Sequence, residues 1–525
     1  MPYKPVVLAV LDGFGVNIGS PQSTWRYAKR PTFEMLEKHC PFTVLQASGT
    51  AVGLPWGEEG NSEVGHRTMG AGRAIYSHLP RISLAIEDGS FFSNPAFEKA
   101  VGHVRKNQSR LHAMGLFSSG SVHAHADHLY AMLEFARRAG IAELYLHLFT
   151  DGRDAPQQEA AGWFMELEKR LVSDFAFAKI ASVIGRRWAL DRDGHWDFIE
   201  KTYQLLTIGK GAPYAHPSLH IEANYAKKIT DEFIEAGYLE ESGLPVGRIQ
   251  KGDAVLFLDF REDSARELTS AFVLDGFDRF GRRKIPNLLF VTMTQYDQSF
   301  PAEVAFEPIL IEQPLSRVVS EAGLRQLHIA ETEKYAHVTY FFNGGREERY
   351  PNEDWVLIPS PEASPEKAPE MSAPQITEAV IAGLGTYDFI LVNYANADMV
   401  GHTGNFTRTA EALEALDRAM SVLVPAVIKS GGALVITSDH GNAEEKLYRQ
   451  TGEARTKHTS NPVPFFLATP EVQWNRERTG AEIEKQYRNV QGVLADVAPT
   501  VLELLGLRSA PDMTGVSLIP ILSKP

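Results

Sequence analysis

Short apolar runs recur along the chain, and each stops abruptly at charged or small polar residues. The first run covers residues 6–11 and ends at Asp12. Comparable runs cover residues 144–149, 180–184, 254–258, 389–392 and 433–436. Continuous apolar runs of this length are typical of strands that are buried on both faces, as in parallel sheets covered by helices.

Patterns with helical spacing lie between these runs. They cover residues 128–139, 157–172, 409–429 and 493–505. Alternation of strands and helices predicts an α/β fold. In open α/β sheets, ligands bind beyond the carboxyl ends of the strands, and the charged residues stand at those ends. Solvation alone explains the charges of a single loop, but it is a weak explanation for six strand ends that carry Asp, Arg or His.

The distribution of polar residues predicts two domains, one of them split in sequence. Acidic and histidine-rich segments cluster in residues 12–66 and 398–458, whereas arginines cluster in residues 123–261. We therefore expect one domain from residues 1–76 and 311–525, with a second domain of residues 77–310 inserted into it. The segment 351–374 holds six prolines and is predicted to be a long loop.

Composition narrows the class of protein. The chain has 525 residues, with 52 Lys and Arg against 66 Asp and Glu, for a net charge of −14. An acidic chain is a poor nucleic-acid binder, although a local pocket can still attract a small anion. The one cysteine, Cys40, predicts a reducing compartment, and no apolar run reaches the length of a membrane span. We expect a cytoplasmic protein with neither a nucleic-acid nor a membrane partner.

A set of carboxylates and imidazoles near strand ends predicts a metal site. Its members are Asp12, Asp398, His402, Asp439, His440 and His458. Asp398 and His402 are four residues apart, so one face of a helical turn can present both to one ion. Asp439 and His440 are adjacent after a strand and can serve different parts of a site or two ions. Any one such pair occurs often by chance, but the whole set favours Mn or Zn, which accept nitrogen and oxygen ligands together.

A second motif is Gly60-Asn61-Ser62-Glu63-Val64-Gly65-His66. The flanking glycines leave the Ser62 hydroxyl accessible, and a helix that starts there would point N–H groups at an anion. A serine needs a base or a metal to become a nucleophile, and the metal ligands elsewhere in the chain favour the metal. The alternative is a serine that only caps a helix.

A third set of candidate residues consists of four arginines and a lysine, together with an aspartate and a histidine. Arg153, Arg186, Arg192 and Arg261 follow strand-like runs, and Lys334 joins them. Guanidinium groups pair bidentately with carboxylate or phosphate, so converging arginines predict a substrate with more than one anionic group. Asp154 is a candidate general base, and His123 is a candidate phosphate ligand or proton shuttle. Each arginine by itself is explained as well by a surface ion pair.

Three longer motifs carry a resemblance to a known family. They are Glu-Thr-Glu-Lys-Tyr-Ala-His-Val-Thr from Glu331, Met399–Gly404 and Asp439–Asn442, and weaker similarity runs nearly end to end. With them the chain resembles the cofactor-independent phosphoglycerate mutases of the alkaline-phosphatase-like superfamily. The resemblance implies an alkaline-phosphatase-like sheet-and-helix domain with a second α/β domain inserted. It also implies interconversion of 3-phosphoglycerate and 2-phosphoglycerate in glycolysis and gluconeogenesis, independent of 2,3-bisphosphoglycerate.

The resemblance also assigns roles to residues. Asp398, His402 and His458 would bind one Mn2+, and Asp12, Ser62, Asp439 and His440 the other, although other divalent metals remain open. Ser62 would carry the phosphoryl group, and Asp154 would act on the hydroxyl that receives it. The substrate-binding residues would be His123, Arg153, Asp154, Arg186, Arg192, Arg261 and Lys334.

The sequence leaves the oligomeric state, the exact activity and one substrate contact open. We expect a monomer whose inserted domain closes over the substrate and excludes water, since water would turn the enzyme into a phosphatase. A metal-dependent phosphatase, or a mutase of another phospho-sugar, is the alternative activity. Ser264 stands where the family usually has an arginine, so either Arg266 replaces that arginine or the anion is held less tightly. Asp259 stands where asparagine is expected.

Overall fold

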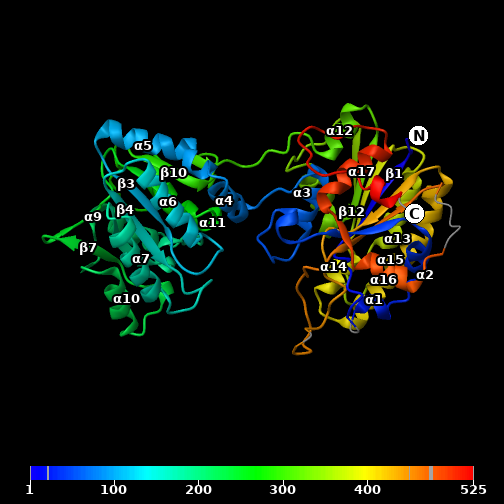
Figure 1. Cartoon of the computed structure of the whole chain (residues 1–525), viewed down its shortest axis with the longest axis horizontal. Helices are drawn as coiled ribbons and strands as arrows, with labels where there is room; N and C mark the ends of the chain where they lie inside the picture. Colours follow the sequence, from blue (N-terminus) through cyan, green and yellow to red (C-terminus); the bar gives the residue numbers. More distant parts are fainter. Residues whose placement is uncertain (1, 21–22, 449, 472–476, 524–525) are drawn as a thin grey trace. The chain divides into compact units, whose positions relative to one another are not determined.

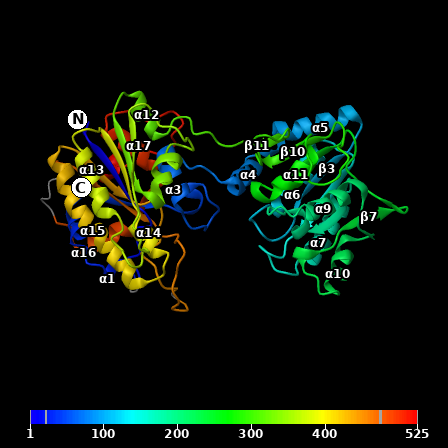
Figure 2. The same cartoon turned by 180° about the vertical axis from the view of Figure 1, so that it is seen from behind.

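The computed structural model describes residues 2–20, 23–448, 450–471 and 477–523. Its contacts divide the chain into two compact units. Unit 1 consists of residues 1–77 and 309–525, and unit 2 consists of residues 78–308. Figures 1 and 2 show from opposite sides that each unit is a sheet with helices packed around it. The predicted α/β fold with two domains is confirmed.

Unit 1 is built on a mixed sheet with the strand order β13-β12-β14-β1-β15-β16-β2-β17 within the described ranges. Its strands are β1 (Val6–Leu11), β2 (Phe42–Gln46), β12 (Gln326–Glu331), β13 (Glu353–Ile358), β14 (Phe389–Tyr394), β15 (Ala433–Thr437), β16 (Val463–Ala468) and β17 (Val490–Val493). Strand β1 runs parallel to both β14 and β15, with Val6 opposite Phe389 and Ala433. Only the β16 pairings, with β15 and β2, are antiparallel among the described strands of this sheet.

Helices cover both faces of this sheet. They are α1 (Thr24–Tyr27), α2 (Pro31–His39), α3 (Ser62–Ala71), α12 (Leu315–Glu321), α13 (Ala373–Gly383), α14 (Asn396–Gly401), α15 (Phe406–Lys429), α16 (Gly480–Tyr487), α17 (Val497–Leu504) and α18 (Ile519–Leu522). Alternate residues of β1 point to opposite faces. Val7 and Leu11 belong to one core cluster with Leu416 of α15, and Leu8 belongs to another with Val501 of α17. Because each buried aliphatic side chain contributes roughly 1.5–3 kcal/mol, this central strand holds both layers together.

Unit 2 has its own sheet, with the order β11-β10-β9-β3-β4-β5-β7-β6, and β8 pairs with β7. Its strands are β3 (Leu111–Leu116), β4 (Leu144–Thr150), β5 (Ala178–Gly185), β6 (Ala212–Tyr214), β7 (Gly237–Glu241), β8 (Leu244–Pro245), β9 (Ala254–Phe257), β10 (Leu289–Thr294) and β11 (Glu303–Phe306). Its helices are α4 (His78–Glu87), α5 (Pro95–Asn107), α6 (Ala126–Arg138), α7 (Ala160–Asp174), α8 (Arg186–Ala189), α9 (Trp196–Ile208), α10 (Pro217–Tyr225) and α11 (Glu262–Val273). The run from β11 to β5 is parallel, so the carboxyl ends of β3, β4, β5 and β9 lie at one edge.

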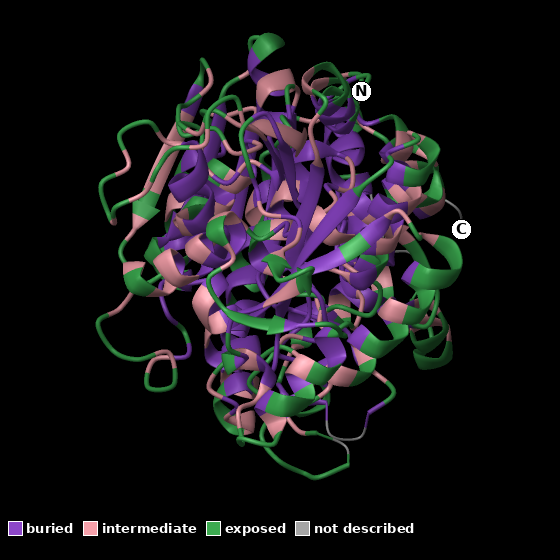
Figure 3. Cartoon of the chain, turned by 90° about the vertical axis from the view of Figure 1, so that its left-hand side faces the viewer, coloured by how far each residue is buried: buried purple, intermediate pink, exposed green. Residues whose placement is uncertain are grey.

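Burial follows the apolar runs. Figure 3 shows central strands in purple and many outward-facing helix and loop residues in green.

The prediction of a long loop over residues 351–374 is wrong in part, because β13 occupies Glu353–Ile358 and pairs parallel with β12. Its prolines flank this edge strand and do not interrupt it, and all but one of its six positions are partly or fully exposed to solvent. Among the described residues, no helix combines the length and apolar character that a membrane crossing requires.

Candidate functional site

The parallel strands of unit 1 bring polar groups from distant parts of the sequence to one edge of the sheet. Asp12 follows β1, and Asp439 lies two residues after β15. Lys334 ends a short 3-10 turn, Thr332–Lys334, that follows β12. Ser62 is the first residue of α3, whose N-cap Asn61 accepts a hydrogen bond from the Val64 amide. Strand order and helix capping therefore place these side chains together.

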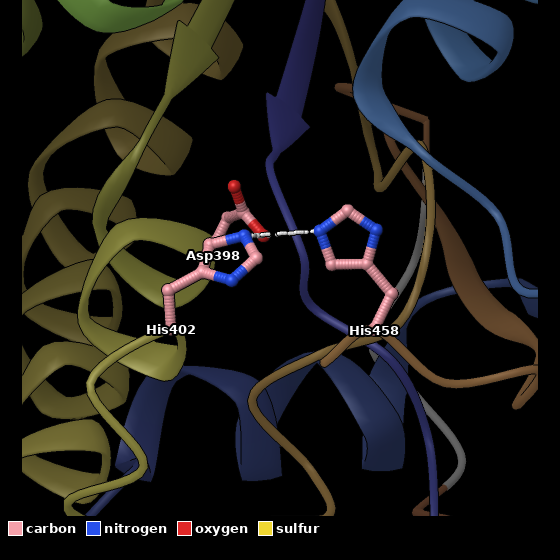
Figure 4. Close-up of side chains that lie close together, drawn as sticks. All are labelled: Asp398, His402 and His458. Carbon is pink, nitrogen blue, oxygen red and sulfur yellow. Dashed lines mark hydrogen bonds and ion pairs between the residues drawn. The ribbon is translucent and has the colours of Figure 1, made fainter. Parts of the chain in front are cut away.

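Asp398, His402 and His458 form the first candidate metal group, with their ligand atoms within 4.8 Å of one another (Figure 4). The Nδ1 atoms of His402 and His458 lie 2.9 Å and 2.8 Å from the carbonyl oxygens of Thr456 and Gly60, so each Nδ1 donates. In neutral rings both Nε2 atoms then carry lone pairs. They lie 3.0 Å apart, and 3.2 Å and 3.3 Å from Asp398 Oδ1. Such an arrangement is repulsive without a cation, so these residues fit a divalent ion.

Asp12, Asp439 and His440 form the second candidate group. The Ser62 hydroxyl joins it, because Ser62 Oγ donates to Asp12 Oδ1 at 3.1 Å and lies 3.0 Å from His440 Nε2. All three ligand side chains are fully buried. Asp439 Oδ2 receives no well-aligned hydrogen bond from the described residues, and the nitrogen nearest to it is His66 Nδ1 at 3.1 Å, which is already bonded to the Ser62 carbonyl oxygen. These donors also fit a divalent ion.

Lys334 supplies positive charge between the two groups. Its Nζ donates to Asp12 Oδ1 at 2.7 Å, to Asp398 Oδ2 at 2.6 Å and to Ser62 Oγ at 2.8 Å. Burial by itself raises a carboxyl pKa, but the Lys334 ammonium outweighs it and holds the pKa of Asp12 and Asp398 well below their ordinary values. Burial likewise opposes charge on His440, yet Asp439 and Asp12 raise the pKa of His440 to about 10. The cluster therefore favours positive charge strongly.

Sequence reasoning missed three residues that orient the ligands. Asn393 Nδ2 donates to Asp12 Oδ2 at 2.8 Å, and Asn442 Nδ2 donates to Asp398 Oδ1 at 2.8 Å. His66 Nδ1 lies 2.9 Å from the carbonyl oxygen of Ser62. Partners of this kind fix ligand orientation and basicity. In the sequence, Asn442 and His66 are marked by their place inside two of the motifs described above. Asn393 is marked by its place at the end of an apolar run.

The strand ends of unit 2 form a small polar cavity of about 150 Å3. Its lining residues are Val122, His123, Arg153, Asp154, Arg186, Arg187, Leu190, Asp191, Arg192, Asp193, Glu232, Arg261 and Ser264. The structure thus brings His123, Asp154 and the four predicted arginines together. Lys334 instead lies in the unit 1 cluster, and Arg187 is an additional guanidinium that the sequence did not single out. Five arginines in one cavity suit an anionic ligand.

Arg186 organises one side of this cavity. Its Nη1 donates to Asp154 Oδ2 at 2.6 Å and to Asp151 Oδ1 at 2.8 Å, and its Nη2 lies 2.7 Å from His123 Nε2. Burial and the Arg186 charge lower the pKa of His123 to about 4, so this imidazole is neutral at physiological pH. Asp151, which is buried, anchors the arginine and was also missed from sequence.

The opposite side of the cavity is held by Asp263. Its carboxylate accepts from Arg192 Nη1 at 2.6 Å and from Arg261 Nε at 3.0 Å. Burial works against ionisation, but the two guanidinium groups lower the pKa of Asp263 to about 2. Arg266 donates to the carbonyl oxygen of Tyr296 at 3.0 Å and is not among the residues that line this cavity.

The fold and the two clusters define a two-unit α/β protein with a candidate two-metal centre around a serine hydroxyl and a separate arginine-lined anion cavity. The family described as BPG-independent PGAM N-terminus (iPGM_N) matches residues 82–298. The 2,3-bisphosphoglycerate-independent phosphoglycerate mutase of Chloroflexus aurantiacus is 45% identical over 98% of both chains. That of Thermomicrobium roseum is 47% identical, again over 98% of both. The crystal structure of Leishmania mexicana phosphoglycerate mutase is 30% identical, covers 98% of both chains and gives a TM-score of 0.56.

This chain belongs to the family of 2,3-bisphosphoglycerate-independent phosphoglycerate mutases.

Proposed function

We propose that this protein interconverts 3-phosphoglycerate and 2-phosphoglycerate through a phosphoserine at Ser62, without 2,3-bisphosphoglycerate. One observation carries the proposal most directly. Ser62 Oγ lies within hydrogen-bond distance of Asp12, His440 and Lys334, and Lys334 links the two groups of side chains that could hold metal ions. Family membership and the arginine-lined cavity of unit 2 support the same reaction.

The surroundings of Ser62 suit a nucleophile. Bound divalent ions would neutralise charge on phosphoryl oxygens and lower the pKa of the Ser62 hydroxyl. Asp12 Oδ1 accepts the Ser62 hydroxyl hydrogen, and Lys334 Nζ donates to Ser62 Oγ, which stabilises negative charge on Oγ as it attacks phosphorus. The Ser62 Oγ–P bond forms while the bond from phosphorus to the glycerate oxygen breaks, and the proton that Ser62 gives up is balanced by the one that the glycerate oxygen takes up.

The second half of the reaction needs a base for the other glycerate hydroxyl. We assign this role to Asp154, whose carboxylate lines the cavity and is held by Arg186 at 2.6 Å. Asp154 takes the hydroxyl proton as that oxygen attacks the phosphoserine, the Ser62 Oγ–P bond breaks, and an equivalent proton returns to Ser62 Oγ. Arg153, Arg186, Arg192 and Arg261 hold the carboxylate and phosphate, and His123 binds the substrate in the same cavity. The reaction requires these residues and Ser62 to act on one substrate molecule.

The proposed cofactor is a pair of Mn2+ ions. Asp398, His402 and His458 would bind one ion, and Asp12, Ser62, Asp439 and His440 the other. Mixed nitrogen and oxygen donors support Mn and do not exclude Zn or Co. Metal analysis of chelated protein reloaded with each metal in turn, together with its activity, identifies the ion that works. We further propose a cytoplasmic monomer, which light scattering of the purified chain tests for oligomeric state.

The decisive assay supplies 3-phosphoglycerate and Mn2+ without 2,3-bisphosphoglycerate, and couples the product to enolase. We expect product in the coupled assay, loss of product after chelation and little free phosphate. Ser62→Ala is the matched variant, since it removes only the oxygen that would carry the phosphoryl group. Full activity of Ser62→Ala refutes the nucleophile assignment, whereas free phosphate released as fast as product formation supports a phosphatase instead.

A further inference from the structure

Ser264 makes a buried contact with the catalytic cavity that family membership does not explain. It lies in the first turn of α11 and is 2% exposed. Its Oγ lies 2.8 Å from His123 Nδ1. Among the described residues, His123 Nδ1 is the hydrogen-bond partner of Ser264 Oγ.

The partners of His123 determine which ring nitrogen carries hydrogen. A guanidinium group only donates hydrogen bonds, so the contact of 2.7 Å from Arg186 Nη2 requires a lone pair on His123 Nε2. In the neutral ring the hydrogen must then lie on Nδ1, and Ser264 Oγ accepts it. The ring therefore turns its lone pair toward Arg186 and toward Asp154, whose Oδ2 lies 3.5 Å from Nε2.

The backbone restricts the histidine at the same time. The amide of Phe260 donates to the carbonyl oxygen of His123 at 2.7 Å, which ties the histidine loop to the segment after β9. The hydroxyl of Thr294 donates to the carbonyl oxygen of Phe260 at 2.9 Å. With the main chain fixed, the ring orientation depends on what meets Nδ1, and Ser264 is that group.

We propose that Ser264 is a positioning residue that holds His123 as a neutral imidazole with Nε2 presented to the substrate cavity. In this state His123 accepts a hydrogen bond from Arg186 and forms no ion pair with Asp154, so the Asp154 carboxylate stays available as a base. The charged groups that face His123 are Arg186, Asp154, Arg261 and Asp263. The kinetic part of this inference rests on the proposed mutase reaction, whereas the tautomer does not.

Three variants of the full chain test the proposal. Ser264→Ala removes the acceptor, and Ser264→Thr restores a hydroxyl. Ser270→Ala is the matched control, because Ser270 is a buried serine of the same helix whose hydroxyl bonds to the Glu267 carbonyl oxygen at 2.6 Å. The first readout is nitrogen-15 NMR of labelled histidine, which reports the tautomer and charge of His123 without any substrate.

We expect wild type, Ser264→Thr and Ser270→Ala to show His123 protonated at Nδ1 alone from pH 5 to pH 8. In Ser264→Ala the released ring can turn toward Asp154, so it should become a mixture of tautomers and gain a proton between pH 5 and pH 7. In the coupled assay the KM of Ser264→Ala should rise about tenfold, the effect of one buried hydrogen bond, and should acquire a new pH dependence, with Ser264→Thr close to wild type.

Unchanged His123 signals in Ser264→Ala overturn the proposal. An equal rise in KM in Ser270→Ala, or no rescue by Ser264→Thr, also overturns it, because a general loss of packing then explains the effect. If wild type lacks mutase activity, the proposed function fails, and the nitrogen-15 readout alone decides the role of Ser264.

Discussion

Asp259 offers a test of the electrostatics of unit 2 in which the size of the effect can be worked out. Its side chain is 0% exposed. Oδ1 accepts a hydrogen bond from the Leu116 amide at 2.8 Å, and Oδ2 receives none from the described residues. Burial raises the pKa of Asp259 to about 7, and the Leu116 hydrogen bond and the Arg186 charge offset only part of that effect. Asp259→Asn keeps the shape and removes the charge.

The raised pKa fixes the sign of the effect. A carboxyl group whose pKa is higher in the folded than in the unfolded chain favours folding when it is protonated, and this advantage disappears as pH rises through the folded value. With a pKa of about 7 in the folded chain against about 3.9 in the unfolded chain, about 4 kcal/mol is lost by pH 8.5, but only about 2 kcal/mol at pH 5.5. Asp259→Asn should therefore be more stable than wild type, with the gain growing by about 2 kcal/mol between these pH values.

Hydrogen exchange of the full chain, followed by mass spectrometry in increasing urea, measures this gain in the slowest amides of β3 and β9. Comparison of variant and wild type at the same pH cancels the intrinsic exchange rate. Asp278→Asn is the control, because Asp278 is an exposed aspartate of the same unit. An equal change at both pH values, or a variant less stable than wild type at pH 8.5, would refute the reasoning.

Three further predictions concern charge. Lys334→Met should destabilise the metal-free protein by about 3 kcal/mol, because it leaves the buried carboxylates without a positively charged partner. In thermal unfolding, Mn2+ should restore part of this loss. An unchanged melting temperature of the variant in the presence of chelator contradicts the prediction. Because the pKa of His440 is raised to about 10, Mn2+ binding should release protons, and its affinity should increase from pH 6 to pH 9. Calorimetry in two buffers measures the proton release, and a result of no release contradicts the prediction. Arg153→Ala should raise KM about tenfold with little change in kcat. The control Arg346→Ala alters an exposed arginine of unit 1 and should match wild type. Equal effects of the two substitutions on KM rule out a specific role for Arg153.

The fold could be predicted wherever both faces of a strand are apolar. Strand β1 is buried at every position, and its apolar run has the same bounds as the observed strand. Strand β13 escaped prediction because it is a half-exposed edge strand among prolines. Backbone pairing with β12 holds it in the sheet, and backbone hydrogen bonds leave no pattern in the side chains.

The candidate site follows the same division. Asp12 and Asp439 could be singled out because they stand directly beyond buried strands, where ligands of an α/β sheet gather. The hydrogen-bond partners of Asn393 and Ser264 could not be predicted. The contact of Asn393 joins positions 381 residues apart, and that of Ser264 joins positions 141 residues apart. Such pairs depend on the strand order and on the rotation of each side chain, and one sequence carries neither.

If the phosphoryl group passes through Ser62, rapid acid quenching during turnover will trap it there. Wild-type protein mixed with 3-phosphoglycerate and Mn2+ is quenched during turnover, digested and analysed by mass spectrometry. We expect one added phosphoryl group on the peptide that contains Ser62, and none when chelator replaces the metal. Turnover with that peptide unmodified, or with the phosphoryl group on a different residue, would contradict it.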